Sequence, residues 1–216
     1  MSVKNYILGY HEFMQIKLFF RLMVIITSSL LLASCASLPT QPQPPQNQSL
    51  SWENRVSTLS GIQNWDLKGL IALRTAKNAW SANWQWQQVK HTYMISLFGP
   101  LGSNSFRLTG NPQNVLLETA DGKKFAANNP ESLLAEQLGW QLPVSYLHYW
   151  IRGLPVPNLA ARKQFDAYHH LTLLMQQGWT IRYLNYVSVG HTDLPSKIFL
   201  ANRALQVKII ISQWKF

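Results

Sequence analysis

Residues 80–89 read WSANWQWQQV, a run in which aromatic side chains alternate with small or polar ones. Successive side chains of a strand point to opposite faces, so Trp80, Trp84 and Trp86 share one face. The preceding run, residues 64–74, reads NWDLKGLIALR and alternates in the same way. Two such runs at hairpin spacing predict half-buried antiparallel strands.

The same period of two recurs along most of the remaining chain. It is found in residues 93–97, 106–108, 115–117, 179–183 and 205–211. Asp121 and Gly122 predict a tight hairpin turn. His169 and His170 are expected to be neighbours in a strand, with their rings on opposite faces. The sequence therefore predicts one bent antiparallel sheet with an apolar, aromatic face.

Helical signals flank and interrupt these strands. Ser51 is a good N-cap for a helix whose apolar residues run to Ile62. Residues 129–131 read NPE and predict a second helix that stops at Gly139, and Pro143 opens a third that stops at Gly153. The fold class is mainly β with a few helices. Because the helices are too few to cover the sheet, closure around an apolar cavity is expected.

The N-terminal segment is typical of a bacterial lipoprotein leader. Basic Lys17 and Arg21 precede an apolar run over residues 22–32, which is too short to span a membrane comfortably. Residues 32–35 read LASC, the lipobox pattern that ends in the thiol to be acylated. We interpret residues 1–34 as a signal peptide, with a possible true start at Met14. A signal anchor with an incidental cysteine is the alternative.

Cys35 is the only cysteine of the 216 residues, so no intramolecular disulfide can form and the core alone must stabilise the fold. Lipidated at Cys35, the chain would be held on a membrane without a spanning helix. The residue after Cys35 is Ala36 and not aspartate, which by the sorting rule for such lipoproteins predicts the outer membrane as the destination. The domain would then face the periplasm. Residues 35–50 are rich in Pro, Gln and Ser and predict a disordered tether, followed by a folded domain over 51–216.

The chain is basic, with a formal net charge of +10. The leader holds Lys4, Lys17, Arg21 and Glu12, so most of the excess belongs to the mature part. In a secreted protein this charge favours an anionic lipid surface or an acidic partner, and no nucleic-acid partner is expected. A generic basic surface explains it equally well.

Motifs for catalysis, metal binding or phosphate binding are not found in the sequence. None of the six histidines has metal-ligand spacing, and no Gly-x-Ser-x-Gly elbow or glycine-rich phosphate loop is present. Each histidine is read as a solvated or core-edge residue. We therefore expect no enzyme activity, no cofactor and no metal.

The chain resembles the outer-membrane lipoprotein LolB family in four segments that follow in order. These are WDLKGLIA with WSANWQW (65–72 and 80–86), GPLG (99–102), WIRGLP (150–155) and VKIIISQW (207–214). The resemblance implies an unclosed antiparallel barrel with a helical lid around an apolar cavity. It also implies acceptance of lipoproteins from the periplasmic carrier LolA and their insertion into the outer membrane.

The candidate site residues follow from the apolar rows and from one turn. The acyl-chain cavity is predicted to be lined by Trp65, Trp80, Trp84, Trp86, Ile95 and Ile181, although any of them could instead fill an ordinary core. Phe98, Pro100 and Leu101 lie in a turn that would normally be polar. The resemblance makes them a membrane-insertion loop with Leu101 at its tip, and the alternative is a loop tucked against a neighbouring strand.

Other functions fit parts of the same pattern. A lipid-anchored protein could bind a small apolar ligand without handover. A lipid-anchored hydrolase would show clustered carboxylates or a Ser/His pair in its cavity. An envelope scaffold would have a filled core. We expect a monomer whose partners are LolA, lipoprotein acyl chains and the membrane.

Overall fold

The structure, a computed structural model, describes residues 50–99 and 105–216. Its strands are β1 (Asn64–Arg74), β2 (Ala79–Val89), β3 (Thr92–Phe98), β4 (Phe106–Gly110), β5 (Val115–Thr119), β6 (Lys124–Ala127), β7 (Arg162–Phe165), β8 (Leu171–Gln176), β9 (Trp179–Val189), β10 (Thr192–Ala201) and β11 (Gln206–Lys215). Its helices are α2 (Trp52–Gly61), α3 (Pro130–Leu138) and α4 (Val144–Trp150). None of the helices in the described part of the chain is long and apolar enough to cross a membrane. The leader, Cys35, the tether up to residue 49, Pro100 and Leu101 lie outside the described residues.

All eleven strands belong to one antiparallel sheet in the order β6-β5-β4-β3-β2-β1-β11-β10-β9-β8-β7. Strands β1 to β6 form one meander and β7 to β11 another, and the pairing of β1 with β11 joins them. Strands β6 and β7 end the order, so the described sheet is unclosed. The predicted fold class, mainly β with an unclosed antiparallel sheet, is confirmed.

The aromatic rows of β1 and β2 lie side by side, as their alternation predicts. Leu67 pairs with Trp86, and Gly69 pairs with Trp84. Most inward residues of both strands are buried, and the outward ones are mostly exposed. Gly69 also lies at a bulge against β11, where a Cβ atom would come within 2.0 Å of the Ile210 carbonyl oxygen. Only glycine permits this close approach of the two backbones.

The starts of the three helices and the end of α3 follow the predicted caps, whereas α4 ends at Trp150, before the predicted stop at Gly153. The Ser51 hydroxyl accepts a hydrogen bond from the Asn54 amide at the start of α2, and Asn129 caps α3 through the Ser132 amide. Gly139 ends α3 in the left-handed conformation with φ of 70°. Each cap satisfies a backbone group that the helix itself leaves without a partner.

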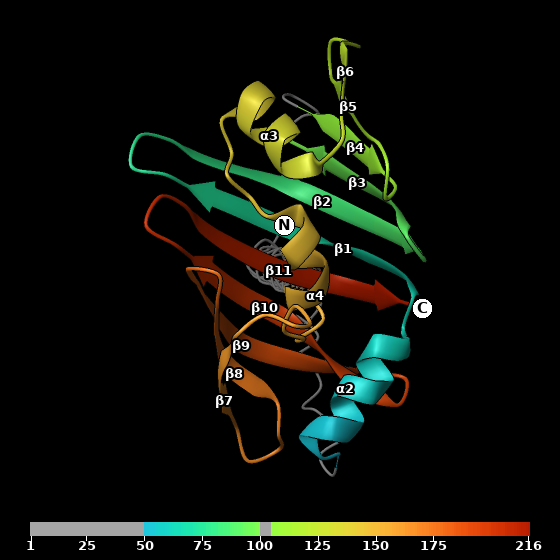
Figure 1. The fold of residues 1–216 in the computed structure, drawn as a ribbon, viewed down its shortest axis with the longest axis vertical. Helices are drawn as coiled ribbons and strands as arrows, with labels where there is room; N and C mark the ends of the chain where they lie inside the picture. The colour runs from blue at the N-terminus through green and yellow to red at the C-terminus, as the bar shows by residue number, and fades with distance from the viewer. Residues whose placement is uncertain (1–49, 100–104) are drawn as a thin grey trace, which may run out of the picture. The chain divides into compact units, whose positions relative to one another are not determined.

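Helix α4 and the segment that leads to it lie over one face of the sheet (Figure 1), and ring contacts show that this is the aromatic face. The ring of His148 lies 6.1 Å from that of Trp65 and 6.5 Å from that of Trp86. Farther along the sheet, the ring of Trp150 lies 6.0 Å from that of Trp179. The hydrophobic core therefore fills the space between the sheet and α4, and each fully buried large side chain contributes roughly 1.5–3 kcal/mol.

The prediction of a strand through His169 and His170 is wrong. Both residues lie in the turn between β7 and β8, and His169 has a φ of 60°. His169 is exposed and His170 is buried, so the two rings do occupy different environments. The turn causes this difference, and not the alternation of a strand.

Candidate functional site

The six predicted cavity residues share the apolar side of the sheet. Trp65 lies on β1, Trp80, Trp84 and Trp86 on β2, and Ile95 on β3, where it pairs with Trp86. Ile181 lies apart, on β9, with β11 and β10 between its strand and β1. Trp80 is half-buried, and the other five residues are at most 5% exposed.

The buried indoles differ in how their N–H groups are satisfied. Trp86 donates to Gln88 Oε1 at 3.0 Å, and Trp150 donates to Gln176 Oε1 at the same distance. The Nε1 atoms of Trp65 and Trp84 are buried and have no hydrogen-bond partner among the described residues. The aromatic face therefore holds two donors whose hydrogen-bonding capacity the fold leaves unused.

A pocket of about 450 Å³ opens at the α3–α4 end of this face. We call it the mouth pocket. The mouth pocket is lined by Trp86, Gln88, Lys90, His91, Tyr93, Asn111, Pro112, Val115, Asn128, Asn129, Pro130, Val144, Ser145, His148 and Tyr149. Because Trp86 is one of them, the pocket reaches the aromatic row from outside.

Arg152 connects α4 to the end of α2 and fixes the state of His148. Its Nη1 donates to the carbonyl oxygens of Leu59 and Ile62 at 3.0 and 2.9 Å. Its Nη2 lies 3.0 Å from His148 Nε2. Arginine can only donate, so Nε2 accepts and the remaining ring proton is on Nδ1. Burial, helped by the charge of Arg152, lowers the pKa of His148 to about 4, which keeps the ring neutral at physiological pH.

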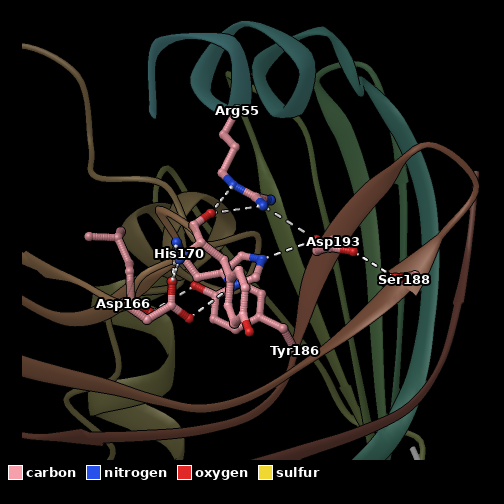
Figure 2. A network of polar contacts seen from close by, with 8 residues as sticks. Arg55, Asp166, His170, Tyr186, Ser188 and Asp193 are labelled. Carbon is pink, nitrogen blue, oxygen red and sulfur yellow. Dashed lines mark hydrogen bonds and ion pairs between the residues drawn. The ribbon is translucent and has the colours of Figure 1, made fainter. Parts of the chain in front are cut away.

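A second polar cluster, which we call the α2 network, consists of Arg55, Asp166, His170, Ser188 and Asp193 (Figure 2). Arg55 on α2 contacts Asp193 Oδ2 on β10 at 3.3 Å. His170 lies between two carboxylates, with Nε2 at 3.0 Å from Asp193 Oδ2 and Nδ1 at 2.9 Å from Asp166 Oδ2. Both ring nitrogens of His170 thus lie within hydrogen-bond distance of a carboxylate oxygen.

The α2 network does not have the geometry of a hydrolase site. The Ser188 hydroxyl donates to Asp193 Oδ1 at 2.7 Å, whereas a nucleophilic serine donates to the histidine. Asp193 is fully buried, and the His170 ring is stacked on Tyr186 at 4.3 Å. The buried ion pair between Arg55 on α2 and Asp193 on β10 indicates that the network holds α2 against the sheet.

Sequence reasoning misjudged His170 and missed its partners. The expectation that every histidine is solvated or at the core edge is wrong for His170, which is 2% exposed. Arg55 and Asp193 are separated by 138 residues, so no local pattern could bring them together. No group of three or more His, Cys, Asp or Glu placed to hold a metal occurs within residues 50–99 and 105–216.

The predicted membrane-insertion loop is only partly described. Phe98 is the last residue of β3, and its side chain is 37% exposed. Pro100 and Leu101 lie outside the described residues, so their role stays a prediction.

Asp193→Asn is expected to lower the free energy of unfolding by roughly 3 kcal/mol at pH 7, because it removes a charge from a buried ion pair. Burial alone would raise the pKa of Asp193, but hydrogen bonds from Ser188 and His170 and the charge of Arg55 together lower it. A lowered carboxylate pKa stabilises the fold above the ordinary value of 3.8 and ceases to do so as the pH falls below it. Urea unfolding between pH 7 and pH 2 should therefore show a shallower acid decline for the variant.

Asp121→Asn is the matched control. Asp121 also has a lowered pKa, through hydrogen bonds with Lys123 and Thr119, but both members of its ion pair are exposed. Solvent screens such a pair, so the urea midpoint at pH 7 should change little. Equal losses of unfolding free energy in the two variants would contradict the conclusion that the α2 network holds α2 against the sheet.

Comparisons with known proteins agree with this geometry. The fold of this chain is similar to that of a solved Vibrio parahaemolyticus domain described provisionally as an outer membrane lipoprotein-sorting protein. That structure overlays with a TM-score of 0.53 at 8% identity, over 76% of this chain and 89% of the other.

The family model for the outer membrane lipoprotein LolB matches residues 63–214. The outer-membrane lipoprotein LolB of Nitrosococcus oceani is 38% identical over 90% of this chain and 97% of its own length. That of Pseudomonas syringae pv. syringae is 36% identical over 92% and 97%. The chain belongs to the outer membrane lipoprotein LolB family.

Proposed function

We propose that this protein is a receptor, anchored to the outer membrane by lipid and facing the periplasm. It accepts lipoproteins from the carrier LolA, shelters their acyl chains and inserts them into the membrane. The observation that carries the proposal is the continuous aromatic face beneath α4, with the mouth pocket opening at Trp86. Membership of the LolB family supports the same role.

The physical problem that such a receptor solves is the exposure of acyl chains to water. Each exposed CH₂ costs about 0.8 kcal/mol, so three long chains cost on the order of tens of kcal/mol. When the chains move from the cavity of one protein to that of another they stay buried, so the net free energy of transfer can be small. Handover then needs no nucleotide, provided that the receptor binds somewhat better than the carrier and the bilayer better still.

The acyl chains would lie on the face formed by Trp65, Trp80, Trp84, Trp86, Ile95 and Ile181. That face is covered by α4, so binding requires the seven-residue helix to move. Two polar side chains hold the end of this helix. The Tyr183 hydroxyl donates to the Trp150 carbonyl oxygen at 2.9 Å, and Arg152 donates to the Leu59 carbonyl oxygen near the end of α2. An apolar face with few hydrogen bonds suits a ligand recognised mainly by its hydrocarbon.

The excess of basic residues supports the choice of partners. A positive field attracts an acidic carrier and the anionic lipid surface to which the cargo is delivered. No step of the proposed function needs catalysis, a cofactor or a metal.

The anchor is proposed to be Cys35, acylated after cleavage of the leader. Mass spectrometry of the protein purified from membranes should find residue 35 at the N-terminus, heavier than cysteine by a diacylglyceryl group and an amide-linked acyl chain. In Cys35→Ser the mass should match an uncleaved or unmodified chain, and the protein should leave the membrane fraction. An unmodified Cys35 in the wild type would refute the anchor.

The proposed function is tested by transfer in solution. The mature chain carrying Cys35→Ala, which cannot be acylated, is mixed with purified carrier loaded with a labelled lipoprotein. The label should move to the receptor without ATP and then to added liposomes. Label that stays on the carrier would refute the role of receptor.

An envelope scaffold is the second candidate, because Trp65, Trp84 and Trp86 are no more than 2% exposed and fill the core in this structure. A scaffold would bind no acyl chain at all. The same transfer experiment therefore separates the two candidates.

A further inference from the structure

Tyr93 on β3 lines the mouth pocket, and its hydroxyl is not explained by folding. The Oη atom is buried and has no hydrogen-bond partner among the described residues. By contrast, the hydroxyls of Tyr183 and Tyr186 donate to backbone carbonyl oxygens, each at 2.9 Å. A buried hydroxyl without a partner destabilises a fold, and phenylalanine would fill the same space without that cost.

The backbone opposite Tyr93 is adapted to hold its ring. Gly110 on β4 is the partner of Tyr93 in the sheet, and a Cβ atom there would lie 2.3 Å from both Cζ and Oη of the tyrosine. The absence of a side chain at position 110 thus lets the phenol ring lie across β4. Burial, with the nearby charge of Glu131, raises the pKa of Tyr93, so the hydroxyl stays protonated and remains a donor.

His148 also lines the mouth pocket and carries a second neutral donor. Its Nε2 accepts from Arg152, which leaves the N–H on Nδ1. The indole of Trp65, whose N–H also has no partner among the described residues, packs against the His148 ring. Uncharged donors at the edge of an apolar face are suited to neutral carbonyl oxygens, which need no counter-charge.

We propose that Tyr93 and His148 bind the ester or amide carbonyl oxygens of an acylated cysteine, so that the mouth pocket recognises the junction between the acyl chains and the polypeptide. This assignment rests on the proposed function and deepens it, because the cargo is then selected by its polar linkage as well as by its hydrocarbon. The buried apolar row would hold the chains, and the pocket would hold the glycerol and cysteine that carry them.

Tyr93→Phe tests the assignment in the mature chain carrying Cys35→Ala. Three probes are titrated. They are a synthetic triacylated cysteine peptide, its analogue in which ether and alkyl linkages replace the ester and amide carbonyls of the three acyl chains, and a short-chain diacyl phosphatidylethanolamine. The variant should bind the triacylated peptide at least about fivefold more weakly than the wild type does, because one hydrogen bond is lost. It should bind the carbonyl-free analogue with the same affinity as the wild type. Its melting temperature should rise, because an unsatisfied buried hydroxyl is removed.

Tyr186→Phe is the matched control, since its hydroxyl donates to the Leu171 carbonyl oxygen within the protein. It should lower the melting temperature and leave the preference for the triacylated peptide over its analogue unchanged. The proposal is overturned if Tyr93→Phe binds the triacylated peptide as tightly as the wild type, or if it melts at a lower temperature. Tighter wild-type binding of phosphatidylethanolamine would assign the pocket to phospholipid and overturn the choice of cargo. A wild type that binds none of the probes would refute the proposed function itself.

Discussion

Arg152→Met is expected to lower the free energy of unfolding by roughly 3 kcal/mol, because it removes several charge-assisted hydrogen bonds at once. Arg152 is 4% exposed, and its guanidinium donates to the carbonyl oxygens of Leu59, Ile62 and His148. Burial lowers its pKa to about 10, so it is still charged at neutral pH. Methionine keeps much of the apolar stem and leaves those carbonyl groups without their donor.

Urea unfolding at pH 7 measures this loss, with Arg107→Met as the control. Arg107 is an exposed residue of β4, and its replacement should change the free energy of unfolding by less than about 0.5 kcal/mol. If Arg152→Met cost no more than the control, α2 and α4 would not be joined through this side chain. The covering of the aromatic face would then need another explanation.

Leu101→Glu is expected to reduce delivery of lipoprotein to liposomes about tenfold or more, while acceptance from the carrier and the melting temperature change little. Gly99 and Gly102 flank Pro100 and Leu101, and from this sequence we expect a turn with Leu101 at its tip. Inserting that leucine into a bilayer gains roughly 1.5–3 kcal/mol, whereas a carboxylate is repelled by anionic head groups and is costly in hydrocarbon.

Leu184→Glu is the control for delivery. Leu184 on β9 is 51% exposed, so the same change of chemistry occurs on the surface of the sheet, on a strand that is not adjacent to β3 or β4. It should leave transfer to liposomes intact. A large fall in the melting temperature of Leu101→Glu would refute the exposed tip, and normal delivery would refute its role in the membrane.

Local signals in the sequence predicted the parts of the fold that local chemistry decides. Ser51, Asn129 and Gly139 cap or end their helices through groups within a few residues. The alternation in β1 and β2 follows from one buried and one solvated face of the sheet. The six predicted cavity residues were placed on the apolar side of the sheet for the same reason, because a buried face is visible as a period of two. That they line an acyl-chain cavity stays a prediction.

Strand β10 was not predicted, because its pattern is irregular. Pro195 lacks an amide hydrogen, and the pairing with β9 shifts register on both sides of Lys197. No simple alternation therefore marks residues 192–201, of which the first four are all buried.

The polar groups of the site could not be predicted, since they depend on contacts between distant segments. The α2 network needs the packing of α2 against β10 before Arg55 and Asp193 can meet. The position of the Tyr93 hydroxyl follows from the register that places Gly110 beside it. Pattern reasoning identified Tyr93 only as one more apolar residue of a strand.

The central claim is that acyl chains lie on the aromatic face beneath α4, and depth-resolved quenching tests it most directly. A triacylated cysteine peptide carrying bromine in the middle of its acyl chains is added to the mature chain with Cys35→Ala, and tryptophan emission is recorded. The account predicts strong quenching, lost mainly in Trp65→Phe and Trp86→Phe, and little quenching by a peptide brominated only in its polypeptide part. Emission unchanged by the chain-brominated peptide at saturation, or quenched equally by both peptides, would contradict it.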